Sequence, residues 1–352
     1  MSSAALHHAI RRLAAGESLT RDEAAEAFGA VMRGEGSDVH VSALLMGLRV
    51  KGESPDELAG VASALRETMI VLADQDPDAL VDTCGTGGGT LTTFNISTAA
   101  ALVAAGAGVR VAKHGNRSFT SKSGSADVLE ALGVRIDLPV ERMREVLDQA
   151  GIVFMFAPTM HPAMRHVGPV RRDLAVQTVM NLVGPLANPA RAGRQVIGVA
   201  DARRLGLIGG ALQTLGTRHS LIVHGEPGLD EVSPLGRTTV LELVDGEARS
   251  WTIDPERLGV RAATANDLAG AHPGENARVV EEVLSGRGRP GAVAAVALNA
   301  AAAIYVAGRA ADFAAALEMA REALREGAGR SALDRLRAAS VTAAGGRSSG
   351  SS

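Results

Sequence analysis

The sequence contains one cysteine and very few aromatic residues. A single thiol, Cys84, cannot form a disulfide within the chain, so a disulfide-stapled scaffold is excluded. Aromatic side chains make up 2% of the 352 residues, with one tryptophan, Trp251, and no interleaving of aromatic and basic residues. Proteins that bind single-stranded nucleic acid stack bases on aromatic rings. The sequence offers no such platform.

The chain also lacks an excess of charge of one sign and a strongly apolar run. Its 36 Lys and Arg residues against 39 Asp and Glu residues give a net charge of −3. Nucleic acids and anionic membranes favour basic surfaces, so we expect neither as a partner. The longest apolar stretch, 291–308, is mostly alanine and contains Asn299, which indicates a buried helix of a water-soluble protein. The first thirty residues carry charges throughout, so a cytoplasmic protein is expected.

Metal and thiol motifs are missing as well. The nine histidines show neither metalloprotease nor zinc-finger spacing. Cys84 has no histidine at a catalytic spacing, so a small buried residue is a better interpretation than a nucleophile. Any catalytic site must therefore use other residues.

Two patterns of apolar residues indicate an α/β protein with a small all-helical domain. From Ala4 to about Leu72, apolar residues recur at helical spacing, and Ser18-Leu19-Thr20 and Ser54-Pro55-Asp56-Glu57 provide helix starts. Short β-branched runs then alternate with alanine-rich helical stretches such as 99–105 and 126–132, which predicts a mostly parallel central sheet covered by helices. The predicted strands are 81–83, 109–112, 152–156, 195–199 and 220–224.

These patterns set the expected domains. Residues 1–72 with about 171–189, a helical stretch ending in Gly and Pro breakers, form the small helical domain. Residues 73–170 and 190–343 form the large α/β domain. Residues 344–352 are Gly/Ser-rich and predict a disordered tail.

A glycine-rich loop follows the first predicted strand. Four glycines stand within residues 85–89, and 93–98 then lead into a helix with Asn95, Ser97 and Thr98 at its start. Glycines let backbone N–H groups approach a ligand, and a helix start attracts anions, so the segment predicts a phosphate site. The alternative is a flexible turn with an ordinary helix cap. Neither the Walker A nor the dinucleotide-binding pattern is present.

Two further loops support phosphate chemistry. Lys113-His114-Gly115-Asn116-Arg117 and the hydroxyl-rich 120–125 follow the next strand, where cations and hydroxyls suit several phosphates, although a solvated basic turn is the alternative. Asp230-Glu231 follows a later strand and can hold Mg²⁺ beside a phosphorylated substrate, although a surface acidic turn is the alternative. Arg171 can fork onto a carboxylate.

Together these segments resemble the anthranilate phosphoribosyltransferase family. The resemblance covers most of the chain in the family's order and is carried by residues 85–88, 95–98, 113–117, 124–133, 161–164, 181, 184–186, 188–189 and 229–231. It implies a glycosyltransferase (pentosyltransferase) of tryptophan biosynthesis that transfers the phosphoribosyl group of 5-phosphoribosyl 1-pyrophosphate to the amine of anthranilate and releases pyrophosphate. It also implies a hinge between the two domains and a homodimer that associates through the helical domain.

The resemblance assigns roles residue by residue. It implies that Lys113 and Arg171 are catalytic, that Ser97, Asp230 and Glu231 bind Mg²⁺, and that Gly85, Asn116 and Arg171 contact anthranilate. The implied contacts to phosphoribosyl pyrophosphate are Gly85, Gly88, Gly89, Thr93, Asn95, Ile96, Ser97, Thr98, Lys113, His114, Gly115, Asn116, Arg117, Thr120, Ser121 and Ser125.

The chain departs from the family pattern at Gly89, where an Asp is usual, at Thr90, where Gly is common, and at Thr120, which keeps the hydroxyl of the usual Ser. An acidic group is therefore missing near the pyrophosphate. Two alternatives stay open: a pyrimidine nucleoside phosphorylase-like enzyme, which shares the phosphate loops, and a nonenzymatic relative that binds nucleic acid. The net charge and the residues Arg171, Asp230 and Glu231 speak against the second.

Overall fold

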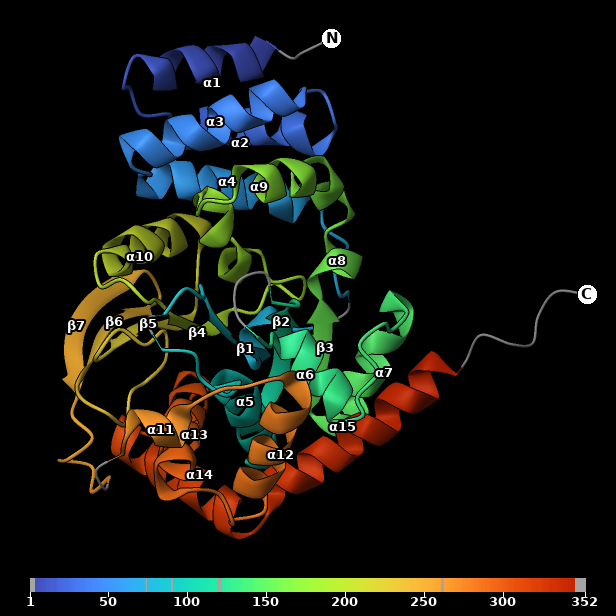
Figure 1. Ribbon diagram of the computed structural model, residues 1–352, viewed down its shortest axis with the longest axis vertical. Coiled ribbons are helices and arrows are strands. Elements are labelled where there is room, and N and C mark those ends of the chain that lie inside the picture. The colour runs from blue at the N-terminus through green and yellow to red at the C-terminus, as the bar shows by residue number, and fades with distance from the viewer. Residues whose placement is uncertain (1–3, 74, 90, 119–121, 261–262, 346–352) are drawn as a thin grey trace, which may run out of the picture.

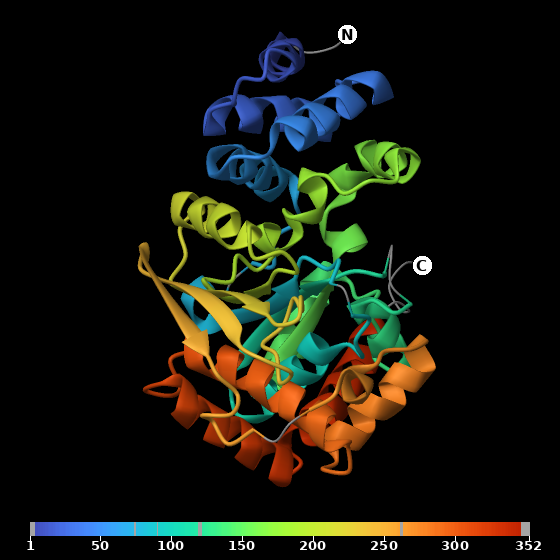
Figure 2. The same ribbon diagram turned by 60° about the vertical axis from the view of Figure 1, so that its left-hand side comes forward.

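The computed structural model describes residues 4–73, 75–89, 91–118, 122–260 and 263–345, and shows a helical layer stacked on an α/β layer (Figures 1 and 2). The expected fold class is confirmed. Both predicted helix starts form capping boxes, in which Thr20 exchanges hydrogen bonds with Glu23 and Ser54 with Glu57. The helical layer begins with α1 (Ala4–Ala14), α2 (Arg21–Met32), α3 (Asp38–Lys51) and α4 (Pro55–Thr68).

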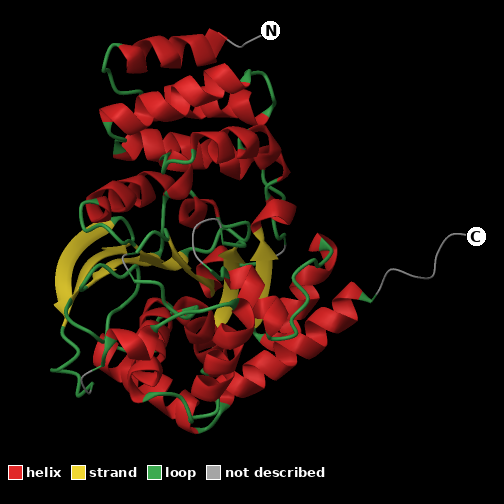
Figure 3. Cartoon of the chain, viewed as in Figure 1, coloured by secondary structure: helices red, strands yellow, loops and turns green. Residues whose placement is uncertain are grey.

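The described residues form one seven-stranded sheet of order β3-β2-β1-β4-β5-β6-β7, seen as a single yellow layer in Figure 3. Strands β1 to β5 run parallel, and the hairpin of β6 and β7 adds antiparallel pairs at one edge. The bounds are β1 (Leu80–Gly85), β2 (Arg110–Gly115), β3 (Ile152–Phe156), β4 (Arg194–Gly198), β5 (His219–Gly225), β6 (Thr238–Val244) and β7 (Glu247–Ile253).

All five predicted strands lie in this sheet, with small shifts of their ends. The β6–β7 hairpin was not predicted. Its signal was an Asp245-Gly246 pair between two segments of mixed polarity, and both turn residues have positive φ. Strand β7 is mostly exposed, so its composition carries little of the apolar pattern that marks a buried strand.

Helices cover both faces of the sheet. One face packs into a large core with η1 (Pro77–Ala79), α5 (Ile96–Gly106), α6 (Ser125–Ala131), α7 (Val140–Ala150), α11 (Ala265–Leu268), α12 (Pro273–Leu284), α13 (Pro290–Val306), α14 (Phe313–Arg325) and α15 (Ala328–Ala344) nearby. The other face contributes Ile197, Ile222 and Leu243 to a second core with α10 (Arg204–Leu215) and the helical layer. The helical layer therefore packs on the sheet through α10, which contacts α4 on one side and β5 and β6 on the other.

The segment expected to be helical at 171–189 is broken into short pieces. Helix α9 (Gly168–Leu174) ends at Ala175, whose φ of 51° is left-handed, and 175–178 are not helical. The expectation of one helical stretch was therefore wrong, because that backbone turn ends the helix before the apolar pattern does. The neighbouring pieces are α8 (Ala157–Met160), η2 (Pro162–His166), η3 (Val179–Asn181) and η4 (Gly184–Ala187).

The apolar stretch 291–308 forms the buried helix α13, as predicted. Within the described ranges, no helix combines the length and apolar character needed to cross a membrane. Helix α15 extends to Ala344, so that residue does not belong to the tail predicted for 344–352; residues 346–352 lie outside the described part.

Candidate active site

Glycines end three neighbouring parallel strands and leave room for an acidic loop. Gly85, Gly198 and Gly225 are the last residues of β1, β4 and β5. A Cβ on Gly85 would lie 2.5 Å from Asp230 Oδ2, and one on Gly198 would lie 1.7 Å from the Asp230 carbonyl oxygen. Side chains at these strand ends would therefore displace the loop. The site lies beside β1, where the strand order reverses between β2 and β4.

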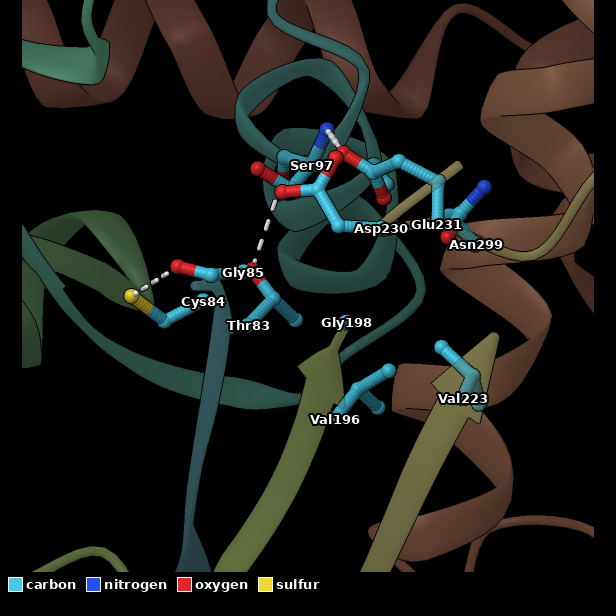
Figure 4. A pocket seen from close by; sticks show the side chains of 11 residues that line it. Thr83, Cys84, Gly85, Ser97, Val196, Gly198, Val223, Asp230, Glu231 and Asn299 are labelled. Carbon is cyan, nitrogen blue, oxygen red and sulfur yellow. Dashed lines mark hydrogen bonds between the residues drawn. The ribbon is translucent and has the colours of Figure 1, made fainter. Parts of the chain in front are cut away.

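Backbone amides hold both carboxylates of this loop, and Figure 4 shows Asp230 and Glu231 beside Ser97. The N–H of Gly87 donates to Asp230 Oδ2 at 3.0 Å, and the N–H of Ser97 donates to Glu231 Oε1 at 3.1 Å. Ser97 lies in the first turn of α5, so the Glu231 carboxylate lies at the positive end of the helix dipole. The structure thus brings together the glycine loop, the start of α5 and the acidic pair, as the sequence predicted.

Asn299 holds the acidic loop through hydrogen bonds to Val232. This buried side chain of α13 accepts a hydrogen bond from Val232 N at 2.8 Å and donates to Val232 O at 2.9 Å. A second donated bond reaches Ala295 O at 2.9 Å within the helix. Because Val232 follows Glu231 directly, the amide sets where the acidic pair stands.

The acidic pair fits a divalent cation. Burial raises the pKa of Asp230, and burial together with the charge of Asp230 raises the pKa of Glu231. Among the described residues, neither carboxylate has a salt bridge, and no three His, Cys, Asp or Glu side chains gather to form a complete metal site. Mg²⁺ commonly binds one or two carboxylates and completes its shell with substrate phosphates and water, which matches this donor set.

The glycine loop and the start of α5 can present backbone N–H groups to an anion, apart from those of Gly87 and Ser97, which donate to the acidic pair. Gly87 and Gly88 adopt φ values of 71° and 82°, which favour glycine. Helix α5 has no side-chain cap, because Asn95 instead accepts from Ser123 Oγ at 3.1 Å and from Asn276 Nδ2 at 3.0 Å. Asn95 therefore links the glycine loop to the loop before α6 and to α12.

The side chains of the segment from Lys113 to Arg117 point to different partners. Lys113 is buried and donates to the carbonyl oxygen of Thr83 and, at 3.3 Å, to its Oγ1. Burial and the neighbouring His161 lower the pKa of His114 to about 3, and its ring Nδ1 lies 3.2 Å from Gly184 O. These two side chains face protein groups rather than open space.

Arg117 and Asn116 are also engaged. Arg117 forms salt bridges with Asp127 at 2.9 Å and Glu130 at 2.5 Å. The Asn116 carbonyl accepts from Ser125 Oγ at 3.3 Å, which closes the loop onto the start of α6. A ligand that used the Arg117 guanidinium would have to compete with two carboxylates.

Arg171 lies on α9 of the helical layer, and burial lowers its pKa. The segment that follows it reaches the glycine loop: a Cβ on Gly88 would lie 2.8 Å from Gln177 Nε2. The segment after α9 thus lies against the glycine loop at Gly88.

The remaining predicted contacts vary in exposure. Ile96 is buried, Thr98 Oγ1 is buried without a hydrogen-bond partner, and Thr93 forms an isolated bridge with Ala269. Gly89 faces the acidic pair, since a Cβ there would lie 3.3 Å from Asp230 Oδ1. Thr90, Thr120 and Ser121 fall outside the described residues. Cys84 as a whole residue is partly exposed. Its thiol is buried, which raises the pKa to about 12 and disfavours the thiolate that a nucleophile requires.

Sequence reasoning missed four residues that build the site: Gly198, Asn299, Asn276 and Gln177. The polar residue within the apolar run was noticed, but nothing in the sequence placed Asn299 under the acidic loop. A glycine at the end of a predicted strand was the available signal for Gly198. Gln177 and Asn276 carried no signal, because their importance comes from segments that are distant in the sequence.

Comparisons with known proteins agree with this geometry. Residues 77–330 match the family described as "Glycosyl transferase family, a/b domain", and residues 7–69 match "Glycosyl transferase family, helical bundle domain". The anthranilate phosphoribosyltransferase of Rubrobacter xylanophilus is 47% identical over 330 residues, which cover 94% of this chain and 96% of that protein. The one from Anaeromyxobacter dehalogenans is 46% identical over 342 residues, covering 96% and 100%.

Solved structures give the same result. The Thermus thermophilus enzyme superposes with a TM-score of 0.88 at 43% identity, covering 94% of this chain and 98% of that one. The Saccharomyces cerevisiae enzyme in complex with phosphoribosyl pyrophosphate and Mg superposes with a TM-score of 0.88 at 26% identity, covering 97% and 99%. A second yeast structure holds 4-fluoroanthranilate, with a TM-score of 0.84 at 25% identity and coverage of 96% and 98%. The chain therefore belongs to the anthranilate phosphoribosyltransferase family.

Proposed function

We propose that this chain carries out the reaction of its family with the residues gathered at the carboxyl ends of β1, β2 and β5. The reaction joins the amine nitrogen of anthranilate to C1 of the ribose of 5-phosphoribosyl 1-pyrophosphate. The bond from C1 to the pyrophosphate oxygen breaks, and the nitrogen loses a proton. The observation that carries the proposal is the acidic pair seated over Gly85 and Gly198 beside the start of α5.

The pyrophosphate is assigned to the glycine loop and the first turn of α5. Gly88 presents its backbone to the ligand, and the positive end of α5 faces the developing negative charge; the N–H groups of Gly87 and Ser97 hold the acidic pair instead. Lys113 contributes a buried positive charge beside β1. The other contacts implied by the family resemblance, from Thr93 to Ser125, belong to this proposal.

Asp230 and Glu231 would hold Mg²⁺, with Ser97 as the third assigned ligand. Their raised pKa values mean that two adjacent negative charges are poorly compensated, and a divalent cation would relieve this. When bound, Mg²⁺ supplies electrostatic stabilisation of the leaving pyrophosphate.

Arg171 is assigned to the carboxylate of anthranilate, with Gly85 and Asn116 as the further contacts. An aromatic amine is unprotonated at neutral pH, so the reaction needs orientation more than a strong base. Arg171 stands on the helical layer and the pyrophosphate site on the sheet, so approach of the two layers would align the nucleophile with C1 and exclude water.

The assembly and compartment are part of the same proposal. Val39 and Val50 on α3 are 76% and 80% exposed, which supports association of two copies through the helical layer. Sedimentation of the purified protein tests for the homodimer, and cell fractionation tests for the expected cytoplasmic location.

Loss of anthranilate fluorescence tests the function directly. Purified protein with phosphoribosyl pyrophosphate and Mg²⁺ should consume anthranilate, and omission of Mg²⁺ should abolish the reaction. A folded protein that leaves anthranilate unconsumed would refute the assignment. A phosphorolysis assay with pyrimidine nucleosides and a salt-dependent DNA shift assay cover the two alternatives, and both should be negative.

A further inference from the structure

Strands β1 and β2 pair only at their beginnings. Their register runs from Leu80↔Arg110 to Val81↔Val111 and stops. The outer neighbours continue to the ends of the strands, to Gly85↔Gly198 between β1 and β4 and to Gly115↔Phe156 between β2 and β3. The sheet is therefore open between β1 and β2 alone, at the end where the glycine loop and the 113–117 loop begin.

Side chains satisfy the backbone groups that this opening leaves. By register Thr83 stands opposite Lys113, and an unbroken parallel ladder would bond Thr83 to Ala112 O and His114 N. Instead, Asn188 Nδ2 donates to Ala112 O at 2.9 Å, and His114 N donates to Asp82 Oδ1 at 3.1 Å.

The two bridging side chains are bonded to each other. Asn188 Nδ2 donates to Asp82 Oδ2 at 2.7 Å, and Asn188 Oδ1 accepts from Ala190 N at 2.8 Å. Of the two groups that remain, the carbonyl oxygen of Thr83 accepts from the ammonium of Lys113, and the N–H of Thr83 donates to the Asp82 carboxylate. Asp82 and Asn188 are 0% and 2% exposed, so water cannot replace either side chain.

A buried carboxylate in this place costs stability. Burial raises the pKa of Asp82, and the charge of Lys113 and the hydrogen bond from Asn188 oppose that shift only in part. Well-packed apolar residues in place of a buried ion pair are often as stable or more stable. However, an apolar wedge would leave Ala112 O and His114 N unsatisfied, so a polar pair is what an open seam requires.

We infer that Asp82 and Asn188 are positioning residues that hold the ends of β1 and β2 apart, so that the glycine loop and the 113–117 loop stand on opposite sides of the phosphoribosyl group. The inference rests on the proposed function for the identity of that group. Both side chains are buried and bonded to protein groups, so the inference assigns neither of them a contact with the ligand. Their effect passes through the backbone of β1 and β2 and through Lys113.

Asp82→Asn and Asn188→Asp test this role because each keeps the shape of the side chain. Asp82→Asn disturbs the bond from Asn188 Nδ2, and Asn188→Asp removes the donor to both Asp82 Oδ2 and Ala112 O. Both should raise the KM for phosphoribosyl pyrophosphate at least tenfold and change the KM for anthranilate less than threefold. Gln195→Met is the matched control: Gln195 is 2% exposed on β4 and donates one hydrogen bond, to Pro185 O at 2.7 Å. It should lower stability and leave both KM values unchanged.

A pH profile separates positioning from a general loss of stability. Asn188→Asp brings two carboxyl groups together, which must share a proton. The KM for phosphoribosyl pyrophosphate should then rise with pH in this variant, and the extra pH dependence should disappear in the double variant Asp82→Asn with Asn188→Asp. Lys113 and His114 on β2 and Cys84 on β1 are the other titratable groups beside the pair, and they are common to all the variants.

The outcomes are distinct. If Asp82→Asn and Asn188→Asp behave like Gln195→Met, with lower stability and an unchanged KM, the inference is overturned. If Asp82→Asn does not fold, Asn188→Ala gives the same comparison, and calorimetry with phosphoribosyl pyrophosphate replaces the rate. A wild-type protein that does not consume anthranilate refutes the proposed function instead, whatever the variants do.

Discussion

At the scale of the residue, the ends of β1 and β4 require glycine, because a larger side chain there would clash with the acidic loop. Gly198 has ordinary backbone conformation, yet the Asp230 carbonyl occupies the place of its Cβ. Its identity is therefore dictated by a segment 32 residues away in the sequence.

We expect Gly198→Ala to move the acidic loop and to raise the Mg²⁺ concentration for half-maximal rate at least tenfold. A contact of 1.7 Å cannot be accommodated without a shift of backbone. Rates at varied Mg²⁺ measure the effect. Gly206→Ala, at an exposed position of α10 with open space around it, is the control and should leave the Mg²⁺ dependence unchanged.

Gly89→Asp should also change the Mg²⁺ dependence, because it adds the carboxylate that the family usually carries there. A Cβ at position 89 would lie 3.3 Å from Asp230 Oδ1, well within a Debye length of about 8 Å, so screening by salt does not remove the interaction. The added charge attracts Mg²⁺ and repels pyrophosphate, so the optimum Mg²⁺ concentration should move. Gly274→Asp adds the same charge at an exposed site and is the control. Identical curves of rate against Mg²⁺ concentration for the wild type, Gly89→Asp and Gly274→Asp would contradict the prediction.

At the scale of the element, helix α13 supplies one amide to the active site from an otherwise apolar stretch. Asn299→Leu would leave Val232 N and Val232 O without partners. We expect a loss of about 2–6 kcal/mol in the free energy of unfolding, since each of these two buried unsatisfied polar groups costs about 1–3 kcal/mol. Binding of Mn²⁺, followed by electron paramagnetic resonance, should weaken.

Leu298→Met tests whether any disturbance of α13 has this effect. It changes a buried neighbour on the same helix while conserving volume, which usually costs less than about 1.5 kcal/mol. Equal losses of Mn²⁺ binding in Asn299→Leu and Leu298→Met would mean that Asn299 only stabilises the core.

Helix α9 carries Arg171 from the helical layer toward the glycine loop. Arg171→Ala should raise the KM for anthranilate about tenfold to a hundredfold, because a hydrogen bond between charged groups contributes about 1.5–3 kcal/mol. Binding of phosphoribosyl pyrophosphate, measured by calorimetry, should change little. Arg172→Ala, at the exposed next position, is the control. Equal losses for both ligands would show that Arg171 holds the layers together and does not bind the substrate.

At the scale of the whole molecule, two buried histidines join the sheet to the segment under the helical layer. Their ring centroids lie 5.0 Å apart, and the Nε2 atom of each ring has no hydrogen-bond partner. Burial lowers the pKa of His114 to about 3 and that of His161 to about 4. Both rings therefore stay neutral in the folded protein at physiological pH.

This pair predicts a loss of stability in mild acid. Below pH 6.5 these two histidines bind protons in the unfolded chain but not in the folded protein. The unfolded state is therefore stabilised relative to the folded state as the pH falls. Each ring lowers the free energy of unfolding by about 1.4 kcal/mol per pH unit between its two pKa values, which gives ~4 kcal/mol for the pair between pH 6.5 and 5. Above pH 7 the pair contributes no slope.

Denaturant unfolding at pH 5 to 7.5 measures this slope. His114→Asn and His161→Asn should each flatten it by about half, whereas Asn in place of the exposed His272 should not. Buried Asp230 and Glu231 have raised pKa values and act in the opposite direction, so the comparison with each variant isolates the histidines. Unchanged slopes in both variants would contradict the prediction.

The sequence by itself determined the fold class, the five parallel strands and the loops that meet at the active site. Apolar periodicity, Ser and Thr caps and glycine clusters are local signals, and the carboxyl ends of parallel strands meet at one edge wherever those strands are. The motifs in these loops also carried the family resemblance, which the comparisons confirmed.

The tertiary structure alone decided how those loops are held. Gly198 under Asp230, Asn299 on Val232, and Asp82 with Asn188 in the open seam are contacts between segments 32, 67 and 106 residues apart. The same structure turned Lys113 toward Thr83 and paired Arg117 with Asp127 and Glu130. Such contacts depend on packing and on the satisfaction of buried polar groups, which are properties of the folded chain and leave no periodic pattern in the sequence.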